Sequence, residues 1–373
     1  MTESQGKRIT PEHGSNDQLL YFTSPSVTDE EERLFFISDR GGHPNLWVQD
    51  LRTSEQRQLS QNTDGTLKSY VYFDGKINRG FGKASVTLDS VRGIAYYLQG
   101  LNIMQANAAG ALRSIGSLPD DQVTAFMHVS GCGRFLCVPT TDARALSDDV
   151  IRPGFDNLEI DKRVQTESLS SYLRIFDTQA GECVHVERVV KAWITHVQFS
   201  PTDSSLILYN HEWPSESCGI RRMWLWDGQT HVALRKEGDG RSRQDWTCHE
   251  MWQRDGKSVI YHGKYHDGPA YLGKWTFDGA TREIALPAGW KQYGHFTVGG
   301  EDELVSDGYF RTDEDDIKGA GKWISKLRVN WLAGEIAWQP LLRSRSSWDS
   351  QDSHPHPIYS ASGEASQAMR LPT

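Results

Sequence analysis

The residues best suited to chemistry lie near the C-terminus, in the sequence Gln351-Asp352-Ser353-His354-Pro355-His356-Pro357. Each histidine precedes a proline, and a residue before proline is displaced from the α region into extended geometry. Residues i and i+2 of an extended chain point to the same side. His354 and His356 should therefore present two imidazoles on one face, with Gln351 close enough to add an amide oxygen. Such a set is typical of a metal site, although a surface loop that happens to carry two histidines has the same pattern.

The composition favours a β-rich globular protein with a polar surface. Only 37% of the 373 residues are apolar, and the mean hydropathy is -0.58. The thirteen Trp, thirteen Tyr and thirteen Phe favour strands. The 34 glycines, against 14 prolines, indicate many tight turns.

The charge and the cysteines exclude several classes of protein. A net charge of -9 argues against non-specific binding to nucleic acid or to a membrane surface. The five cysteines lack C-x-x-C spacing, so we expect free thiols in a reducing compartment. The polar N-terminus has no apolar signal region, and no run of eighteen apolar residues is present. We therefore expect a cytoplasmic protein; the sequence does not indicate its oligomeric state.

A repeat of short strands dominates the chain. Apolar, alternating runs bounded by turn residues recur in units of roughly fifty residues, and each unit holds three or four strands. The units run over residues 34–59, 86–118, 126–189, 194–234, 248–286 and 293–342. Such a repeat predicts a β-propeller; a two-sheet sandwich, the alternative, does not explain the spacing. We expect an all-β, seven-bladed β-propeller over residues 18–363, whose seventh blade begins at His354, with a disordered tail over 1–17 and a C-terminal tail over 364–373.

Histidines stand at the start of four consecutive units. The innermost strand of each propeller blade lines the axial funnel, so residues there gather around one axis. The histidines concerned are His196, His249 and His295, together with the His354-His356 pair. We expect most other histidines to face solvent in turns or strands, namely His13, His43, His185, His231, His262 and His266.

A metal held by histidines and glutamine has a definite chemistry. These ligands are neutral, so the cation keeps its +2 charge and favours an anionic group, above all a carboxylate. A carboxylate bound to a metal loses electron density, which acidifies the adjacent C–H. A histidine can take that proton, and an arginine such as Arg222, which begins an alternating strand, can stabilise the enolate-like charge. These parts suit β-elimination from a uronic acid.

Four segments together resemble the oligogalacturonate lyase family, and the likeness extends over about residues 20 to 360. They are His196–Asp203, Arg222–Leu225, Trp246–Trp252 and Gln351–Pro357, with Tyr21–Ser24 and Phe36–Arg40 in addition. The resemblance implies an intracellular seven-bladed propeller that cleaves short oligogalacturonides by β-elimination to a 4,5-unsaturated uronate, with a divalent metal, usually Mn²⁺. It implies that His295, Gln351, His354 and His356 bind the metal, that His249 is the base and that Arg222 stabilises charge. We further expect His196, His211 and Arg222 to contact the substrate.

The chain departs from the family near its end. Members continue past the His-Pro-His-Pro segment with a strand pair, whereas this chain ends at Thr373 without a further strand pattern. We therefore expect an incomplete seventh blade, in part completed by the N-terminal segment around Leu19–Thr23. An incomplete blade keeps open an alternative of another class, a non-catalytic propeller that binds or scaffolds and retains a vestigial metal site. The propeller of a peptidase is a weaker alternative, because no nucleophile motif is present.

Overall fold

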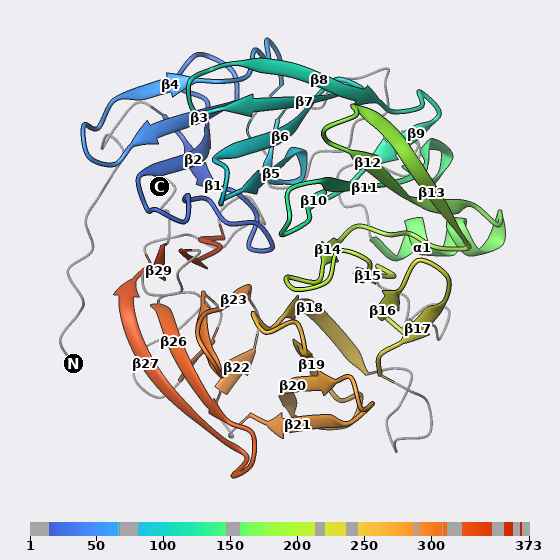
Figure 1. Ribbon diagram of the computed structural model, residues 1–373. Helices are drawn as coiled ribbons and strands as arrows, with labels where there is room; N and C mark the ends of the chain where they lie inside the picture. The colour runs from blue at the N-terminus through green and yellow to red at the C-terminus, as the bar shows by residue number, and fades with distance from the viewer. Residues whose placement is uncertain are drawn as a thin grey trace.

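Antiparallel sheets follow one another around a central axis, so the fold is a β-propeller (Figure 1). The computed structural model describes residues 15–65, 67, 81–146, 157–212, 221–235, 245–286, 290–292, 294–307, 309–311, 323–344, 354–360 and 366–367. Gln351 and most of the two expected tails lie outside these residues. The prediction of an all-β propeller is confirmed.

The first three blades are built from strands that pair in chain order, from the axis outwards. Blade one contains β1 (Asp17–Leu19), β2 (Arg33–Ser38), β3 (Asn45–Asp50) and β4 (Gln56–Gln58). Blade two contains β5 (Val86–Asp89), β6 (Ile94–Gln99), β7 (Asn102–Asn107) and β8 (Leu112–Ser117). Blade three contains β10 (His128–Val129), β11 (Phe135–Asp142), β12 (Ser170–Asp177) and β13 (Glu182–Val190), and β9 (Gln122–Thr124) also pairs with β11.

The next three blades repeat this order. Blade four contains β14 (Val197–Phe199), β15 (Ile207–Asn210), β16 (Met223–Trp226) and β17 (His231–Ala233). Blade five contains β18 (Trp246–Trp252), β19 (Ser258–Lys264), β20 (Ala270–Thr276) and β21 (Thr281–Ala285). Blade six contains β23 (Phe296–Val298), β24 (Glu303–Ser306), β26 (Trp323–Asn330) and β27 (Glu335–Arg343).

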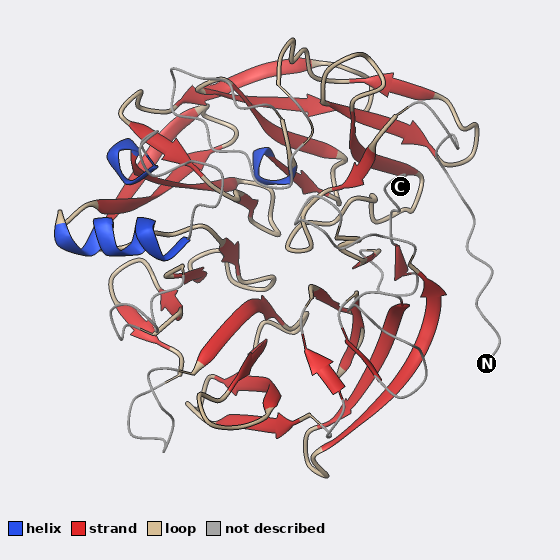
Figure 2. Ribbon diagram, turned by 180° about the vertical axis from the view of Figure 1, so that it is seen from behind, coloured by secondary structure: helices blue, strands red, loops and turns tan. Residues whose placement is uncertain are grey.

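Few other elements accompany the blades. Two-stranded sheets form between β22 (Trp290–Gln292) and β25 (Tyr309–Arg311), and between β28 (Ile358–Tyr359) and β29 (Ser366–Gln367). Helix α1 (Asn157–Thr166) lies at the periphery (Figure 2), and the 3₁₀ turns are η1 (Lys83–Ser85) and η2 (Ala143–Leu146). No helix in the described part of the chain is long and apolar enough to span a membrane.

The prediction of seven blades is wrong, because the described residues form six. In the place expected for the seventh blade, the two-residue strand β28 forms a two-stranded sheet with β29, which lies in the segment assigned to a tail. The N-terminal segment does not add a strand there either. Instead β1 pairs with β2 inside blade one, with Asp17 opposite Ser38.

Side chains of β28 fill the junction between the last and first blades. Ile358 packs in a cluster with Leu19 and Phe36 of blade one. Tyr359 packs with Val305 and Ile324 of blade six. The ring is therefore joined by apolar contacts of one short strand, and the histidines just before that strand are held at the axis.

Blade five depends on a close approach between strands β19 and β20. A Cβ at Gly273 would lie 2.3 Å from the ring of Tyr261, which is fully buried. We expect Gly273→Ala to lower the free energy of unfolding by roughly 1–3 kcal/mol, because the ring has no room to move. The matched control is Gly300→Ala, whose Cβ meets no atom within 4 Å. Chemical denaturation of both variants measures the difference; equal stabilities would contradict this packing.

Candidate active site

The starts of the inner strands bring the predicted residues together. His196 precedes β14, His295 precedes β23 and His356 shortly precedes β28. Phe126 and His196 form a parallel bridge between blades three and four, as expected when inner strands run in the same direction. Because these strands share a direction, their N-terminal ends meet at one end of the axis.

His295, His354 and His356 form a compact group, which we call the histidine trio. Their ligand nitrogens all lie within 4.8 Å of one another, and all three residues are buried. The Nε2 atoms of His295 and His356 are 3.1 Å apart. The structure thus assembles three of the four predicted ligands, while Gln351 lies outside the described residues.

Asp307 fixes the backbone on both sides of the trio. One carboxylate oxygen accepts the backbone N–H of His295 at 2.7 Å, and the other accepts that of His356 at 2.9 Å. Burial raises the pKa of Asp307 to about 7, although these two N–H groups oppose the rise. Sequence reasoning missed Asp307, because nothing in its local sequence distinguishes it from other strand-end aspartates.

The backbone of His356 differs from the expected extended form. Its φ is +48°, in the left-handed region that side chains other than glycine rarely adopt. The hydrogen bond to Asp307 holds this conformation, and such strain is common at functional sites. The imidazoles of His354 and His356 are therefore brought together by a turn of the backbone at His356. The alternation of side chains in an extended strand, which the sequence predicted, does not explain their arrangement.

The nitrogen atoms of the trio fit a cation. The Nδ1 of His356 is engaged by the carbonyl oxygen of His354 at 2.9 Å and by Nζ of Lys83 at 2.6 Å, and its Nε2 is turned towards His295. The Nδ1 of His295 lies 3.7 Å from a carboxylate oxygen of Asp307. The Nε2 atoms of His295 and His356 are 3.1 Å apart, a separation that suits two ligands each about 2.1 Å from one ion.

A buried lysine adjoins the trio and was not assigned a role from sequence. The Nζ of Lys83 lies 2.6 Å from Nδ1 of His356, and Lys83 is only 2% exposed. Burial lowers the pKa of His354 to about 4, and the Lys83 charge lowers it further. The pKa of His356 is shifted well below its ordinary value by the same two causes, in the same order. Neutral imidazoles are the form that binds metals.

His249 stands directly beside the trio. Its ring centroid is 4.3 Å from that of His295. Its Nδ1 lies 2.7 Å from the carbonyl oxygen of Gly294, so Nδ1 donates and Nε2 is left unprotonated. Burial, followed by the neighbouring His262 and the charge of Arg222, lowers the pKa of His249 well below its ordinary value. The residue is therefore a neutral imidazole whose Nε2 is unprotonated and able to accept a proton.

Arg222 is buried between two carboxylates. Its Nη1 lies 3.2 Å from Glu212, and its Nε donates to Glu250 at 2.9 Å. Burial alone would raise the pKa of Glu212, but the Arg222 charge holds it well below its usual range. The guanidinium is thereby held near His249, and its charge is largely compensated.

The two remaining predicted substrate contacts differ in position. His196 accompanies Glu212 at 3.6 Å, and its Nε2 lies 3.1 Å from the hydroxyl of Tyr21, whose ring also approaches His295 and His356. His211 lies farther out, where its ring approaches Tyr209 and Trp224. The structure does not bring His211 to the trio.

The aromatic rings of Tyr21 and Phe22, which follow β1, pack beneath the histidines and form what we call the floor of the site. Tyr21 and Phe22 are buried, and the Phe22 ring lies 5.4 Å from that of His249. On the far side of this floor, a cavity of about 260 Å³ is lined by the later parts of the inner strands, including Thr297 and Ile358. The trio and the cavity therefore lie towards opposite ends of the axis.

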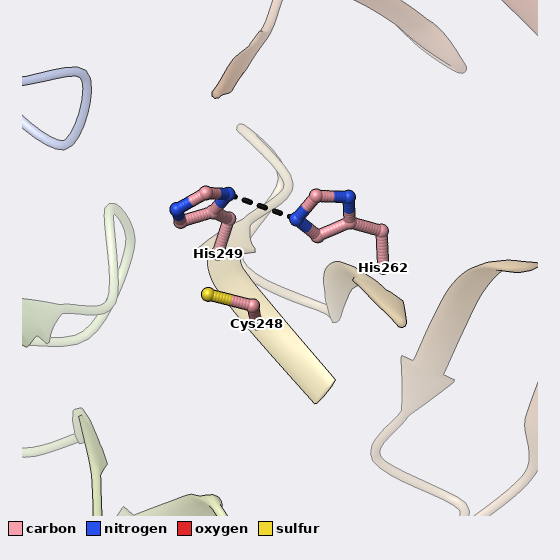
Figure 3. Close-up of side chains that lie close together, drawn as sticks. All are labelled: Cys248, His249 and His262. Atoms are coloured by element: carbon pink, nitrogen blue, oxygen red, sulfur yellow. Dashed lines mark hydrogen bonds between the residues drawn. The ribbon is translucent and has the colours of Figure 1, made fainter. Parts of the chain in front are cut away.

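The prediction that His262 faces solvent is wrong. His262 is fully buried, and its Nε2 lies 2.8 Å from Nδ1 of His249 (Figure 3). The alternation of β19 gives no warning, because nearly the whole strand is buried on both faces.

Comparison with known proteins identifies the fold. No protein-family model matches the chain, and no curated protein matches it. The crystal structure of an oligogalacturonate lyase from Vibrio parahaemolyticus is similar, with a TM-score of 0.71, 20% identity, and coverage of 96% of this chain and 88% of that chain. An oligogalacturonate lyase in complex with manganese also has a TM-score of 0.71, with 19% identity and coverage of 95% and 86%. A chain of the mitotic checkpoint complex has a TM-score of 0.55 at 9% identity, with coverage of 99% and 95%.

These comparisons show a shared β-propeller fold. The expected resemblance to oligogalacturonate lyases is confirmed at that level, because two such structures match nearly the whole chain. The match to a checkpoint protein shows that the fold alone does not define the chemistry. The residues at the axis must carry the functional argument.

The buried charges around Arg222 generate a stability prediction. Replacing Arg222 with Met leaves Glu212 and Glu250 buried without their counter-charge, so we expect a loss of about 3–5 kcal/mol in the free energy of unfolding. The control is Arg134→Met, which breaks an ion pair with Asp177 in which the arginine side chain is 57% exposed. We expect that change to cost at most about 1 kcal/mol. Urea titration of both variants tests this, and similar losses would contradict the role of Arg222 in compensating buried charge.

Proposed function

We propose that this protein is a lyase that cleaves short oligogalacturonides by metal-assisted β-elimination. The observation that carries the proposal is the placement of His249, with an unprotonated Nε2, beside the facing nitrogens of His295 and His356. The fold shared with two oligogalacturonate lyases supports the substrate class.

The trio would hold the metal in this proposal. His295, His354 and His356 supply neutral nitrogens, and Gln351 is the proposed fourth ligand. The relative solved with manganese supports Mn²⁺ as the ion. When bound, the ion draws charge from the uronate carboxylate and so acidifies the proton on the adjacent C5.

His249 is the proposed base. Its Nε2 takes the C5 proton, and the electrons of the C5–H bond form the C4–C5 double bond. The C4–O bond to the next sugar breaks as this bond forms, and the departing oxygen gains a proton from solvent. The products are a shortened oligomer and a 4,5-unsaturated uronate. Burial keeps the imidazole neutral before reaction by lowering its pKa, and the same effect opposes the transfer itself, so the imidazolium that forms needs stabilising neighbours.

Arg222 and His196 complete the proposed site. Arg222 donates to Glu250 and pairs with Glu212, so its guanidinium is fixed in orientation before substrate arrives. In that orientation it would stabilise developing negative charge by directed hydrogen bonds. The Nε2 of His196 is held 3.1 Å from the hydroxyl of Tyr21, and His196 is the proposed contact for substrate hydroxyls.

Metal analysis tests the ligands separately from the chemistry. We expect His356→Ala and His295→Ala to lower the affinity for Mn²⁺ at least about 10-fold, since loss of even an outer partner of a metal ligand has that effect. We expect His249→Ala to retain its metal, because its Nδ1 is engaged by Gly294. Titration with Mn²⁺, followed by elemental analysis, measures both. Full metal binding by the His356 and His295 variants would refute this ligand set.

A lyase assay tests the reaction. The protein is incubated with digalacturonate and Mn²⁺, and the ultraviolet absorbance of the unsaturated product is followed. We expect turnover by the wild type and a fall in kcat of about 10²–10⁴-fold in His249→Ala, which loses the base. The absence of product from any short oligouronide, with metal shown to be bound, would favour the non-catalytic binding propeller.

A further inference from the structure

His249 faces an unusual partner across strands β18 and β19. Cys248 lies directly opposite His262, and opposed side chains point to the same face of a sheet. His249 follows Cys248, so in a regular strand it would point to the opposite face, away from His262. Yet the two imidazole rings lie 4.9 Å apart, with only 23° between their planes.

An irregularity in β18 produces this contact. The pairing shifts between Cys248 and Met251, so that two residues of β18 face the single residue Tyr261 of β19. His249 is one of the two, and its φ is +52°, in the left-handed region. A bulge of this kind redirects a side chain. Here it turns the His249 imidazole to the same face as His262 (Figure 3).

The neighbours of His249 show which of the two imidazoles donates the hydrogen bond between His249 and His262. The carbonyl oxygen of Gly294 lies 2.7 Å from Nδ1 of His249 and can only accept, so Nδ1 carries a proton. The Nε2 of His262, 2.8 Å from the same Nδ1, must then be the unprotonated nitrogen of its ring. One N–H is therefore shared between two fixed acceptors. Trp246 and Phe296 pack around the His262 ring and keep it in place.

We propose that His262 is a positioning residue, which acts through His249 by accepting its Nδ1–H jointly with Gly294. This inference rests on the proposed function, because it assigns His249 as the base. The shared acceptors select the tautomer in which Nε2 is free to take a proton. They also stabilise the imidazolium that forms when it does so, as the orienting group of a catalytic triad does.

A cation between Cys248, His249 and His262 is the rival use of this cluster, since the ligand atoms of all three lie within 4.8 Å of one another. The nitrogen separation of 2.8 Å favours a hydrogen bond. The carbonyl of Gly294 already engages the His249 nitrogen that the ion would need. Burial also raises the pKa of Cys248 to about 12, whereas a thiol must lose its proton to bind a metal.

Two variants of His262 test the proposal. His262→Leu cannot accept a hydrogen bond, whereas His262→Gln keeps an acceptor on a side chain of similar reach. We expect His262→Leu to lower kcat about 10–100-fold, with KM changed by less than about twofold and Mn²⁺ affinity unchanged. We expect His262→Gln to recover most of the lost rate. The control His128→Leu removes a histidine near the opposite end of the axis, where its ring accepts from Phe199, and should keep the wild-type kcat.

Nuclear magnetic resonance provides a readout that does not require turnover. The protein is labelled with ¹⁵N-histidine and loaded with diamagnetic Mg²⁺, and the His249 signals are identified by their loss in His249→Gln. We expect the protonated Nδ1 tautomer at His249 in the wild type and a mixture of tautomers in His262→Leu. A wild type with the proton on Nε2 would overturn the proposal, as would an unchanged kcat in His262→Leu, or a His262→Gln variant as slow as His262→Leu.

These results separate two failures. A wild type that turns over no oligouronide refutes the proposed lyase, whatever the tautomer of His249. A wild type that turns over substrate but shows the wrong tautomer, or tolerates His262→Leu, refutes the positioning role alone.

Discussion

The carboxylate of Asp307 links the two chain segments that carry the histidine trio. Asp307, at the end of the second strand of blade six, accepts the backbone N–H of His295 from its own blade. It also accepts that of His356, from the segment that returns to join the ring. The positions of both imidazoles therefore depend on a single buried side chain. The strained backbone of His356 persists because this bond and the packing of the following strand hold it.

Apolar contacts, in place of sheet pairing, join the last and first of the six described blades. Ile358 and Tyr359 contact blades one and six, and the rings of Tyr21 and Phe22 form the floor between the histidines and the cavity beyond. An open sheet edge would otherwise expose unpaired backbone groups. The packing of Ile358 and Tyr359 adds to the hydrogen bond to Asp307 in holding His356 at the axis.

Charge in the site is arranged so that each buried group has a partner or is neutral. Arg222 lies between Glu212 and Glu250, while burial keeps the imidazoles of the trio and of His249 uncharged. A cation would therefore enter a nearly neutral set of nitrogens and keep its charge for an anionic ligand. The lysine beside His356 adds positive charge at the same place, which further favours a carboxylate over a neutral sugar.

Much of the fold follows from local sequence. Alternating strands and turn residues recur at regular spacing, so the propeller and its first six units were predictable, and the blade starts identified His249, His295, His354 and His356 as neighbours. The number of blades was not predictable, because it depends on which distant strands pair. The roles of Asp307 and Lys83, and the contact of His262 with His249, were not predictable either. Each depends on a contact between residues from separate strands or blades. The sequence by itself determined which histidines stand at the blade starts; only the tertiary structure decided their hydrogen-bond partners, because these bonds form between atoms that folding brings together.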